Sequence, residues 1–362
     1  MGFSCGLVGL PNAGKSTLFN ALANASARVE SYPFCTLEAN VGSIAVPDDR
    51  LDRLAAMFPS KKRIPTHLDF IDIAGLVEHA NEGEGMGSQF LAEIRGVDAI
   101  LHVVRCFEDP NVAHVTGTLD PRRDIAIVET ELLLKDLETL SRAGKHLHLE
   151  TKGPDRLAPA RAAAWDALVD HVARGLPVRS AHIDHLIEDR VREASPLTAK
   201  PHLFVANVGD EGENGFSADV ESAARQRGTE VIAIRGRLEA EIVEATATQE
   251  ERSMFLAEFG LSETSLGPLI RAGYRLLHLV TFFTVEGPEV RAWTVREGMT
   301  APQAGARIHS DFADRFVLAE VMDLPLLIAA GSEKTLRESG KIRRAGRDYA
   351  VRDGDVIHFI CS

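Results

Sequence analysis

An eight-residue stretch near the start of the chain constrains its fold more than any other feature. Residues 9–16 read GLPNAGKS, which matches the pattern G-x-x-x-x-G-K-[ST]. The stretch follows a short apolar run at 3–9 and leads into residues 16–25, whose apolar side chains recur at helical spacing. A glycine-rich loop between a strand and a helix lets backbone N–H groups wrap a polyphosphate. The sequence therefore predicts a phosphate-binding loop.

Residues in and after this loop suit nucleotide and metal binding. Lys15 would neutralise the β- and γ-phosphates, and the Ser16 hydroxyl would coordinate Mg²⁺. Asp72 ends another apolar run in the sequence DIAG, where it would hold the shell of the Mg²⁺ ion while the Gly75 N–H contacts the γ-phosphate. Thr36 lies between the two motifs and is the natural second Mg²⁺ ligand.

Further apolar runs predict the fold class. They lie at 68–73, 99–106, 203–206 and 231–234 and alternate with helical patterns. Unbroken apolar strands between helices are what a parallel sheet covered on both faces requires. We therefore expect an α/β domain with the phosphate-binding loop after its first strand.

The segment from about Ile127 to Pro196 has a different composition, rich in Glu, Leu, Ala, Arg and His. Apolar side chains recur there at helical spacing in two groups, before and after a helix breaker at 153–154: Leu133, Leu137, Leu140 and Leu147, then Trp165, Leu168 and Val172. Two helices folded back on each other would bury both groups, which predicts an inserted helical arm. Ordinary amphipathic helices of the α/β domain are the alternative.

The C-terminal segment, residues 278–362, has its own pattern and charge. It begins with a β-hairpin signature, VTFFTVEGPEVRAWTV, and continues with a helix near 301–308 and short strands near 316–321 and 356–360. The whole chain has a net charge of −13, which does not attract nucleic acid as a whole. Residues 333–352, however, hold seven Lys and Arg against three acids. This basic patch could contact RNA; a solvated hairpin is the alternative.

From the composition and the N-terminal sequence we expect a cytoplasmic chain without membrane association. No run approaches the roughly 18 apolar residues that a membrane-spanning helix needs. The N-terminus lacks a basic region followed by a long apolar stretch, so no signal peptide is expected. The 4 cysteines form no C-x-x-C pair, which argues against a structural zinc site and a disulfide framework.

Several motifs together resemble one family. The stretches GLPNAGKSTLFNAL, YPFCT, DIAGLV, GEGMGSQFL and HVVRCFED are similar to those of the YchF family, the Obg-like ATPases among the translation-factor-type P-loop proteins. The resemblance covers essentially the whole chain. It implies a P-loop nucleotidase domain at 1–126 and 200–277, a coiled-coil arm at 127–199, and a C-terminal TGS domain of β-grasp fold at 278–362.

The resemblance also implies slow, Mg²⁺-dependent hydrolysis of ATP and binding to the ribosome or its large subunit, with RNA contacts through the TGS domain. The nucleotide-binding residues expected on this basis are Asn12, Ala13, Gly14, Lys15, Ser16, Thr17, Gly75, Asn207 and Val208. The expected metal ligands are Ser16, Thr36 and Asp72.

The base that the site reads is less sharply specified. GTPases recognise guanine with Asn-Lys-x-Asp, whereas residues 207–210 read Asn-Val-Gly-Asp and lack the lysine. The family commonly has Glu where this chain has Asp210, and Ser-Ala-Lys where residues 235–237 read Arg-Gly-Arg. We expect adenine to be held by Asn207 and by main-chain groups near Val208 and Arg235, which places ATP ahead of GTP. A GTPase, a dual ATP/GTP switch protein, and a binding protein with nucleotide as a structural ligand are the alternatives.

Catalysis would use an unusual water-orienting group. Many GTPases carry a glutamine after the D-x-x-G motif, but here the residue is Leu76, which cannot form a side-chain hydrogen bond. Our candidate is His114, in a loop that resembles a segment typical of the family; a solvent-exposed loop histidine is the alternative. Asn12 resembles the asparagine of potassium-activated relatives, so K⁺ is a second candidate ion.

Overall fold

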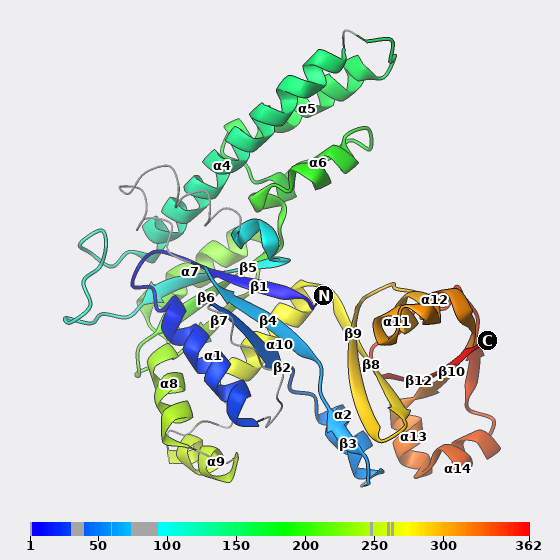
Figure 1. The fold of residues 1–362 in the computed structure, drawn as a ribbon. Coiled ribbons are helices and arrows are strands. Elements are labelled where there is room, and N and C mark those ends of the chain that lie inside the picture. Colours follow the sequence, from blue (N-terminus) through cyan, green and yellow to red (C-terminus); the bar gives the residue numbers. More distant parts are fainter. Residues whose placement is uncertain are drawn as a thin grey trace. The chain divides into compact units, whose positions relative to one another are not determined.

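The chain folds into two compact units (Figure 1). The computed structural model describes residues 2–29, 40–58, 60–73, 93–151, 153–246, 249–258, 261 and 264–362. The first unit comprises Phe3–Gly42 and Asp69–Leu266, and the second comprises Ser43–Leu68 and Gly267–Ser362. Within the described residues, no helix is both long and apolar enough to cross a membrane.

The first unit is built on a six-stranded sheet of order β2-β4-β1-β5-β6-β7. Its strands are β1 (Ser4–Val8), β2 (Val41–Ala45), β4 (His67–Asp72), β5 (Ala99–Cys106), β6 (His202–Val208) and β7 (Val231–Ile234). Strand β1 pairs in parallel with β4 and β5, and β6 pairs in parallel with β5 and β7. Every residue of β5 and β6 is buried. The predicted α/β fold with a parallel sheet is confirmed.

The helices of the first unit either pack on this sheet or pack on one another. They are α1 (Lys15–Val29), α4 (Pro121–Glu150), α5 (Ala158–Ala173), α6 (Glu188–Ala194), α7 (Gly215–Arg227), α8 (Gly236–Ala245) and α9 (Gln249–Glu258), with short 3-10 turns at Val178–Ser180 and Leu197–Ala199. Helix α7 packs on β6, and its Val220 lies in one buried cluster with Phe204. Helix α1 packs against β1 and α8.

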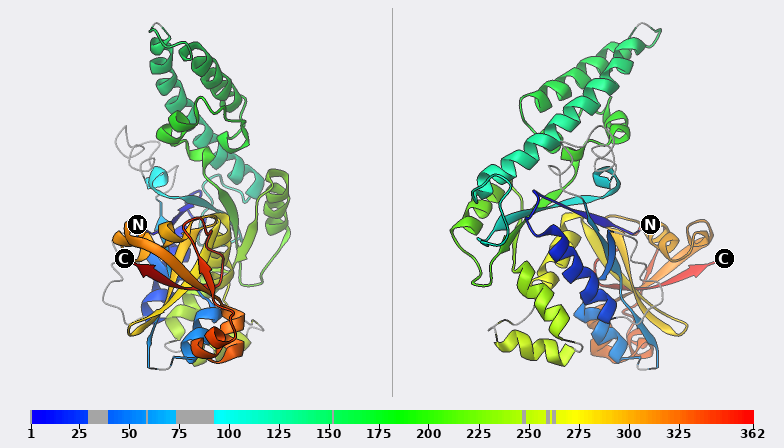
Figure 2. Two further views of the ribbon diagram at one scale, coloured as in Figure 1. Left: turned by 90° about the vertical axis from the view of Figure 1, so that its right-hand side faces the viewer. Right: turned by 60° about the vertical axis from the view of Figure 1, so that its left-hand side comes forward.

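The arm is the antiparallel pair of α4 and α5, which extends away from the sheet (Figures 1 and 2). Both predicted apolar groups meet in one cluster, which includes the buried Leu140, Leu147 and Trp165. The Trp165 indole Nε1 donates a 2.9 Å hydrogen bond to the Leu140 carbonyl. Asp120 caps α4 by accepting from the Arg123 N–H, and proline begins the helix, as in many stable helix starts.

The second unit contains a six-stranded sheet of order β11-β10-β12-β8-β9-β3. Its strands are β3 (Lys62–Ile64), β8 (Leu279–Glu286), β9 (Glu289–Arg296), β10 (Phe316–Asp323), β11 (Arg343–Ala345) and β12 (Asp355–Cys361). Its helices are α2 (Asp49–Ala56), α11 (Ala301–Ile308), α12 (Asp311–Arg315), α13 (Leu324–Ala330) and α14 (Glu333–Glu338), and α10 (Leu266–Leu276) leads into it. The predicted hairpin is β8 and β9, which pair antiparallel.

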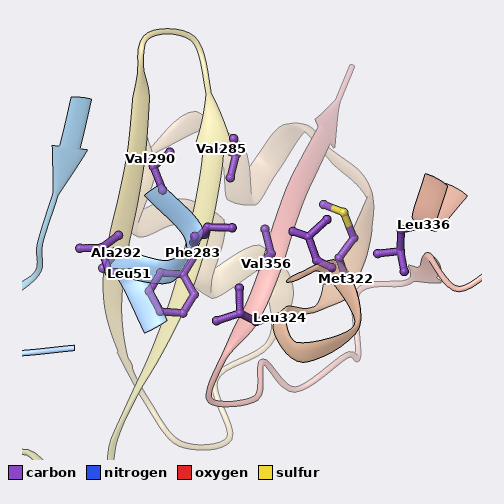
Figure 3. Close-up of a cluster of buried hydrophobic side chains, with 11 residues drawn as sticks. Leu51, Phe283, Val285, Val290, Ala292, Met322, Leu324, Leu336 and Val356 are labelled. Carbon is purple, nitrogen blue, oxygen red and sulfur yellow. The ribbon is translucent and has the colours of Figure 1, made fainter. Parts of the chain in front are cut away.

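Two apolar clusters stabilise the second unit. One contains Phe282, Val295 and Phe359, and the other contains Phe283, Met322 and Val356 (Figure 3). The second cluster also includes Leu51 of α2, so a segment far away in sequence packs with the C-terminal residues. Nothing in the sequence pattern indicated this grouping, and the domain boundaries set from the sequence stay a prediction.

Candidate functional site

The loop between β1 and α1 has the backbone conformation that a phosphate cradle needs. Asn12 and Gly14 have φ values of 61° and 93°, in the left-handed region that turns successive N–H groups toward one side. A Cβ at Gly14 would lie 2.1 Å from the Asn207 side-chain nitrogen, so only glycine fits at this position. The first turn of α1 contains no acidic residue, so nothing there offsets its partial positive charge.

Lys15 is held over this loop. Its side chain is buried, and Nζ donates hydrogen bonds of 3.1 Å to the carbonyl oxygens of Gly9 and Leu10. Ser16 and Thr17 follow at the exposed start of α1. The Lys15 ammonium and the hydroxyl groups of Ser16 and Thr17 therefore all lie at the phosphate-binding loop.

Asp72 lies next to the loop because β4 pairs with β1. Its register partner is Leu7, two residues before Gly9. The Asp72 oxygen Oδ1 is buried and has no hydrogen-bond partner among the described residues. An unpaired buried carboxylate oxygen is costly, and a hydrated Mg²⁺ ion would satisfy it. The residues fit Mg²⁺ in this respect; the expected Thr36 and Gly75 lie outside the described residues.

Asn207 joins three parts of the site. Its Nδ2 donates a 2.9 Å hydrogen bond to the Ala13 carbonyl, and its Oδ1 accepts from the Gly236 N–H at 3.1 Å. The side chain is 5% exposed. Asn207 thus links the phosphate-binding loop, the end of β6 and the start of α8, and its amide faces protein groups.

Residues after Asn207 form a tight turn. Val208 is the buried last residue of β6, and Gly209 and Gly212 form a bridge closed by a 2.9 Å hydrogen bond. Asp210 lies exposed on this turn. The Arg235 guanidinium packs against it, since a Cβ at Gly212 would lie 2.7 Å from an Arg235 nitrogen.

His114 lies in the loop that follows β5. Its Nε2 is 2.8 Å from the Asp124 Oδ2, and only 8% of its side chain is exposed. A solvent-exposed loop histidine, the alternative considered above, does not match this burial. The preceding residue, Ala113, accepts a 3.1 Å hydrogen bond from the Asn12 side chain, so the His114 loop is tied to the phosphate-binding loop.

Asp124 is a candidate residue that the sequence reasoning missed. It lies in the first turn of α4, where an acid is ordinarily explained by the helix dipole. Burial raises the pKa of Asp124, and the hydrogen bond to His114 acts in the opposite direction. Asp124 and His114 line a cavity of about 10 Å³ with Arg105, Pro11 and Ala13, about the space that one water needs.

The basic patch at 333–352 is partly neutralised by acids from other strands. Arg337 donates to both carboxylate oxygens of Glu320 at 3.1 and 2.7 Å, and Arg344 lies 3.7 Å from the same carboxylate. Arg343 lies 3.7 Å from Asp355. The exposed Lys334 and Lys341 form no ion pair within the described residues.

Family models match both ends of the chain. Residues 4–137 match the MMR_HSR1 model, described as a 50S ribosome-binding GTPase. Residues 279–362 match the YchF-GTPase_C model, described as a protein of unknown function (DUF933).

Full-length relatives are also similar. Proteins named ribosome-binding ATPase YchF from Escherichia coli and Bacillus subtilis are each 43% identical to the chain, with 99% of both sequences covered. A solved structure, the YchF GTPase of Schizosaccharomyces pombe, superposes with a TM-score of 0.89 at 32% identity and covers 99% of this chain and 97% of that one. The names of these relatives differ on the nucleotide, ATPase in two and GTPase in the third.

Proposed function

The chain belongs to the YchF family, and from that premise we propose that it is a Mg²⁺-dependent ATPase that binds ribosomes. The conformation of the loop at 9–16 carries the nucleotidase part of the proposal. Two left-handed residues, Asn12 and Gly14, precede a helix that begins with Lys15, which is the arrangement that binds a polyphosphate. The ribosome-binding part rests on the names of the relatives.

The proposed site assigns a role to each group. Backbone N–H groups from Ala13 to Thr17 bind phosphate oxygens, and Lys15 neutralises the charge between the β- and γ-phosphates. Ser16 and Asp72 would hold Mg²⁺ directly or through water, together with the proposed ligand Thr36. Bound Mg²⁺ would stabilise the negative charge that develops on the phosphates. Gly75, which lies outside the described residues, is proposed to contact the γ-phosphate through its N–H.

Asn12 and His114 complete the proposed catalytic machinery. The Asn12 side chain lies at the edge of the loop, where its oxygen can help to hold K⁺ beside the phosphates. His114 orients the attacking water, and the Asn12 to Ala113 hydrogen bond supports this role by tying the two loops together. Each contribution adds to the positioning and charge stabilisation on which phosphoryl transfer depends.

For the base we propose ATP ahead of GTP, with a GTPase or a dual ATP/GTP switch protein as the second candidate. Residue 208 is valine where guanine recognition uses lysine, which favours ATP. Asp210 keeps the guanine candidate open, because an aspartate at this position can accept from guanine N1 and N2. Asn207 is proposed to hold the loops that flank the base, and main-chain groups near Val208 to contact the base itself.

The partner and location follow from the same family. We propose that the protein acts in the cytoplasm, bound to the ribosome or its large subunit, and that the second unit contributes RNA contacts. Since Glu320 and Asp355 neutralise Arg337, Arg343 and Arg344, the charge available to phosphates comes from the other cations of the basic patch, among them Lys334 and Lys341.

Phosphate release measured with ATP and with GTP tests the proposal. ATP turnover that requires Mg²⁺ is expected, and no turnover with either nucleotide would contradict it. Competition at equilibrium decides the base: GTP that displaces labelled ATP at a tenfold lower concentration would overturn the assignment to ATP. In that case Asp210→Glu should restore adenine preference.

A further inference from the structure

We propose that Asp124 is a positioning residue that fixes the orientation of His114, so that the helix carrying the arm also sets the water-orienting group. The inference rests on the proposed ATPase function and on the role proposed there for His114. Asp124 acts through His114 alone and needs no contact with the nucleotide.

The pair is shielded from water. The His114 Nε2 and the Asp124 Oδ2 are 2.8 Å apart, and their side chains are 8% and 5% exposed. A hydrogen bond to a carboxylate in such surroundings is stronger than one at the surface, because little water competes for it. The His114 ring therefore has one strongly favoured orientation.

Thr116 defines which ring nitrogen carries the hydrogen. Its backbone N–H lies 3.3 Å from the His114 Nδ1 and can only donate, so Nδ1 is the accepting nitrogen. Nε2 then carries the hydrogen and donates it to Asp124. The Thr116 hydroxyl also lies 2.9 Å from Nδ1, so both contacts of this nitrogen come from Thr116.

In this arrangement a carboxylate, Asp124, holds an imidazole, His114, in a fixed orientation. The carboxylate fixes the imidazole by Nε2 and leaves Nδ1 as the acceptor, which Thr116 occupies in this structure. In ATP hydrolysis the water oxygen bonds to the γ-phosphorus, the bond to the bridging oxygen breaks, and the water protons end on the phosphate product and solvent. A water that takes the place of the Thr116 hydroxyl at Nδ1 would donate a hydrogen bond to this nitrogen and be oriented for the step.

A purely local role in α4 does not account for Asp124. The helix cap is Asp120, whose side chain accepts from the Arg123 N–H, so Asp124 is not needed for capping. The second oxygen of Asp124, Oδ1, is buried without a hydrogen-bond partner among the described residues. This oxygen lies 3.7 Å from the Arg123 guanidinium, an ion-pair distance but too long for a hydrogen bond. A buried carboxylate oxygen without a hydrogen bond costs free energy, and the bond of the other oxygen to His114 offers a reason to retain the residue.

The same contacts connect the nucleotide site to the arm. Asn12 of the phosphate-binding loop donates to Ala113, His114 follows it, and Asp124 belongs to α4, whose 30 residues continue into the arm. A shift of α4 would therefore move the group that holds His114. A movement of the arm can thus change the position of His114 and, through it, the orientation of the attacking water in ATP hydrolysis.

The kinetic test compares Asp124→Asn, Asp124→Ala, His114→Ala and the double variant Asp124→Ala/His114→Ala in the full-length protein. We expect kcat for ATP to fall about 10- to 100-fold in Asp124→Ala and less in Asp124→Asn, with KM within about twofold of wild type. The double variant should match His114→Ala, because Asp124 acts only through that residue. A further fall in the double variant equal to that of Asp124→Ala, or an unchanged kcat in Asp124→Ala, would overturn the inference.

Asp120→Asn is the matched control. It removes the same charge at the same helix start, keeps a good cap, and lies outside the contact with His114. Its kcat should stay within twofold of wild type, and a fall as large as that of Asp124→Asn would show that charge, not contact, is responsible. Thermal unfolding of each variant establishes that it is folded. If Asp124→Ala does not fold, Asp124→Asn, which is closest in shape to the wild type, replaces it in the kinetic comparison.

A second readout does not depend on turnover. Nitrogen NMR of labelled histidine at pH 8 should show the Nε2–H of His114 in a hydrogen bond to a carboxylate in wild type, and a shifted Nε2 resonance in Asp124→Ala, where that bond is lost. An unchanged Nε2 resonance in Asp124→Ala overturns the inference. Absence of ATP turnover in the wild type with the expected change of the Nε2 resonance would instead contradict the proposed function and leave the positioning of His114 by Asp124 intact.

Discussion

The side-chain amide of Asn207 donates a 2.9 Å hydrogen bond to the carbonyl oxygen of Ala13, across 194 positions of sequence. The same side chain accepts from Gly236, so one buried amide holds the phosphate-binding loop against the start of α8. The amide is therefore occupied by protein groups. From this geometry we infer that Asn207 holds the two loops together and does not itself form hydrogen bonds to the nucleotide base.

Replacing Asn207 tests that separation. In Asn207→Ala the Ala13 carbonyl and the Gly236 N–H lose their partners, at a cost of about 1–3 kcal/mol each. We expect the affinities for ATP and GTP to fall by similar factors, since the loops and not the base contacts are disturbed. Equilibrium binding of both nucleotides measures this, and Asn207→Asp, which keeps only an acceptor, isolates the Ala13 bond. A loss confined to one nucleotide would show that Asn207 reads the base.

Lys15→Ala should abolish nucleotide-dependent turnover. Among the described residues of the loop, Lys15 is the cation beside the proposed position of the β- and γ-phosphates, and such a charge is needed most in the transition state. Phosphate release measures the effect. Lys15→Met, which keeps most of the side-chain volume, controls for collapse of the loop around Gly9 and Leu10. Turnover within a few-fold of wild type in both variants would contradict the proposed site.

His114→Ala and replacement of K⁺ by Na⁺ should each lower kcat. His114 is proposed to orient water, so its loss disturbs the position of the nucleophile. Asn12 is proposed to help bind K⁺, so exchange of the ion changes the positive charge beside the phosphates in the transition state. Turnover in matched chloride salts gives the comparison. If both changes leave kcat as it was, another group must orient the water and the proposed machinery is wrong.

Acid should destabilise the first unit through two buried histidines. Burial lowers the pKa of His102 and of His202 to about 3, from an ordinary value of 6.5. As the pH falls, the unfolded state takes up a proton near pH 6.5, whereas the folded state does so only near pH 3. The free energy of unfolding is therefore highest above pH 6.5 and decreases as the pH falls toward 3. The loss is about 2 kcal/mol for one histidine at pH 5.

Tryptophan fluorescence can follow this effect in one unit. The chain has 2 tryptophans, and Trp293→Phe leaves Trp165, which lies in the arm. Urea unfolding in that background at pH 7.5 and pH 5 should show a smaller loss of stability for His102→Leu than for the parent. Equal losses in the two proteins would mean that the protonation of His102 does not contribute.

The parallel sheet and the loop at 9–16 were predictable because both depend on local signals. Apolar runs mark β5 and β6, and a fixed glycine and lysine spacing marks the loop. The apolar groups of the arm were also visible, since helical spacing indicates which face is buried. The fold class could thus be inferred from periodicity. The packing of the arm could be inferred as well, because the apolar faces of its two helices are buried when the helices pack against each other.

Pairings between distant residues left no such signal. Asp124 lies ten positions after His114, in a place where an acid near a helix start is unremarkable. Glu320 and Arg337 meet only because β10 and α14 fold together, so the charge of the patch at 333–352 could not be judged from a count. The packing of Leu51 with Phe283 likewise depends on tertiary structure.

The last prediction concerns the charge that the second unit offers to RNA. Lys334 and Lys341 are exposed and form no ion pair within the described residues, whereas Arg337, Arg343 and Arg344 lie near acids. A lysine that contacts a phosphate releases counterions on binding, so its loss weakens binding and reduces the salt dependence.

Ribosome co-sedimentation at several salt concentrations measures both effects. In Lys334→Gln/Lys341→Gln the slope of log affinity against log salt should fall by about 2, because each phosphate contact contributes about one unit. Lys145→Gln/Arg156→Gln, two exposed cations of the first unit, makes the same change in net charge and should leave the slope as in wild type. A slope unchanged in the first variant, or reduced equally in both, would mean that these lysines do not form a local RNA contact.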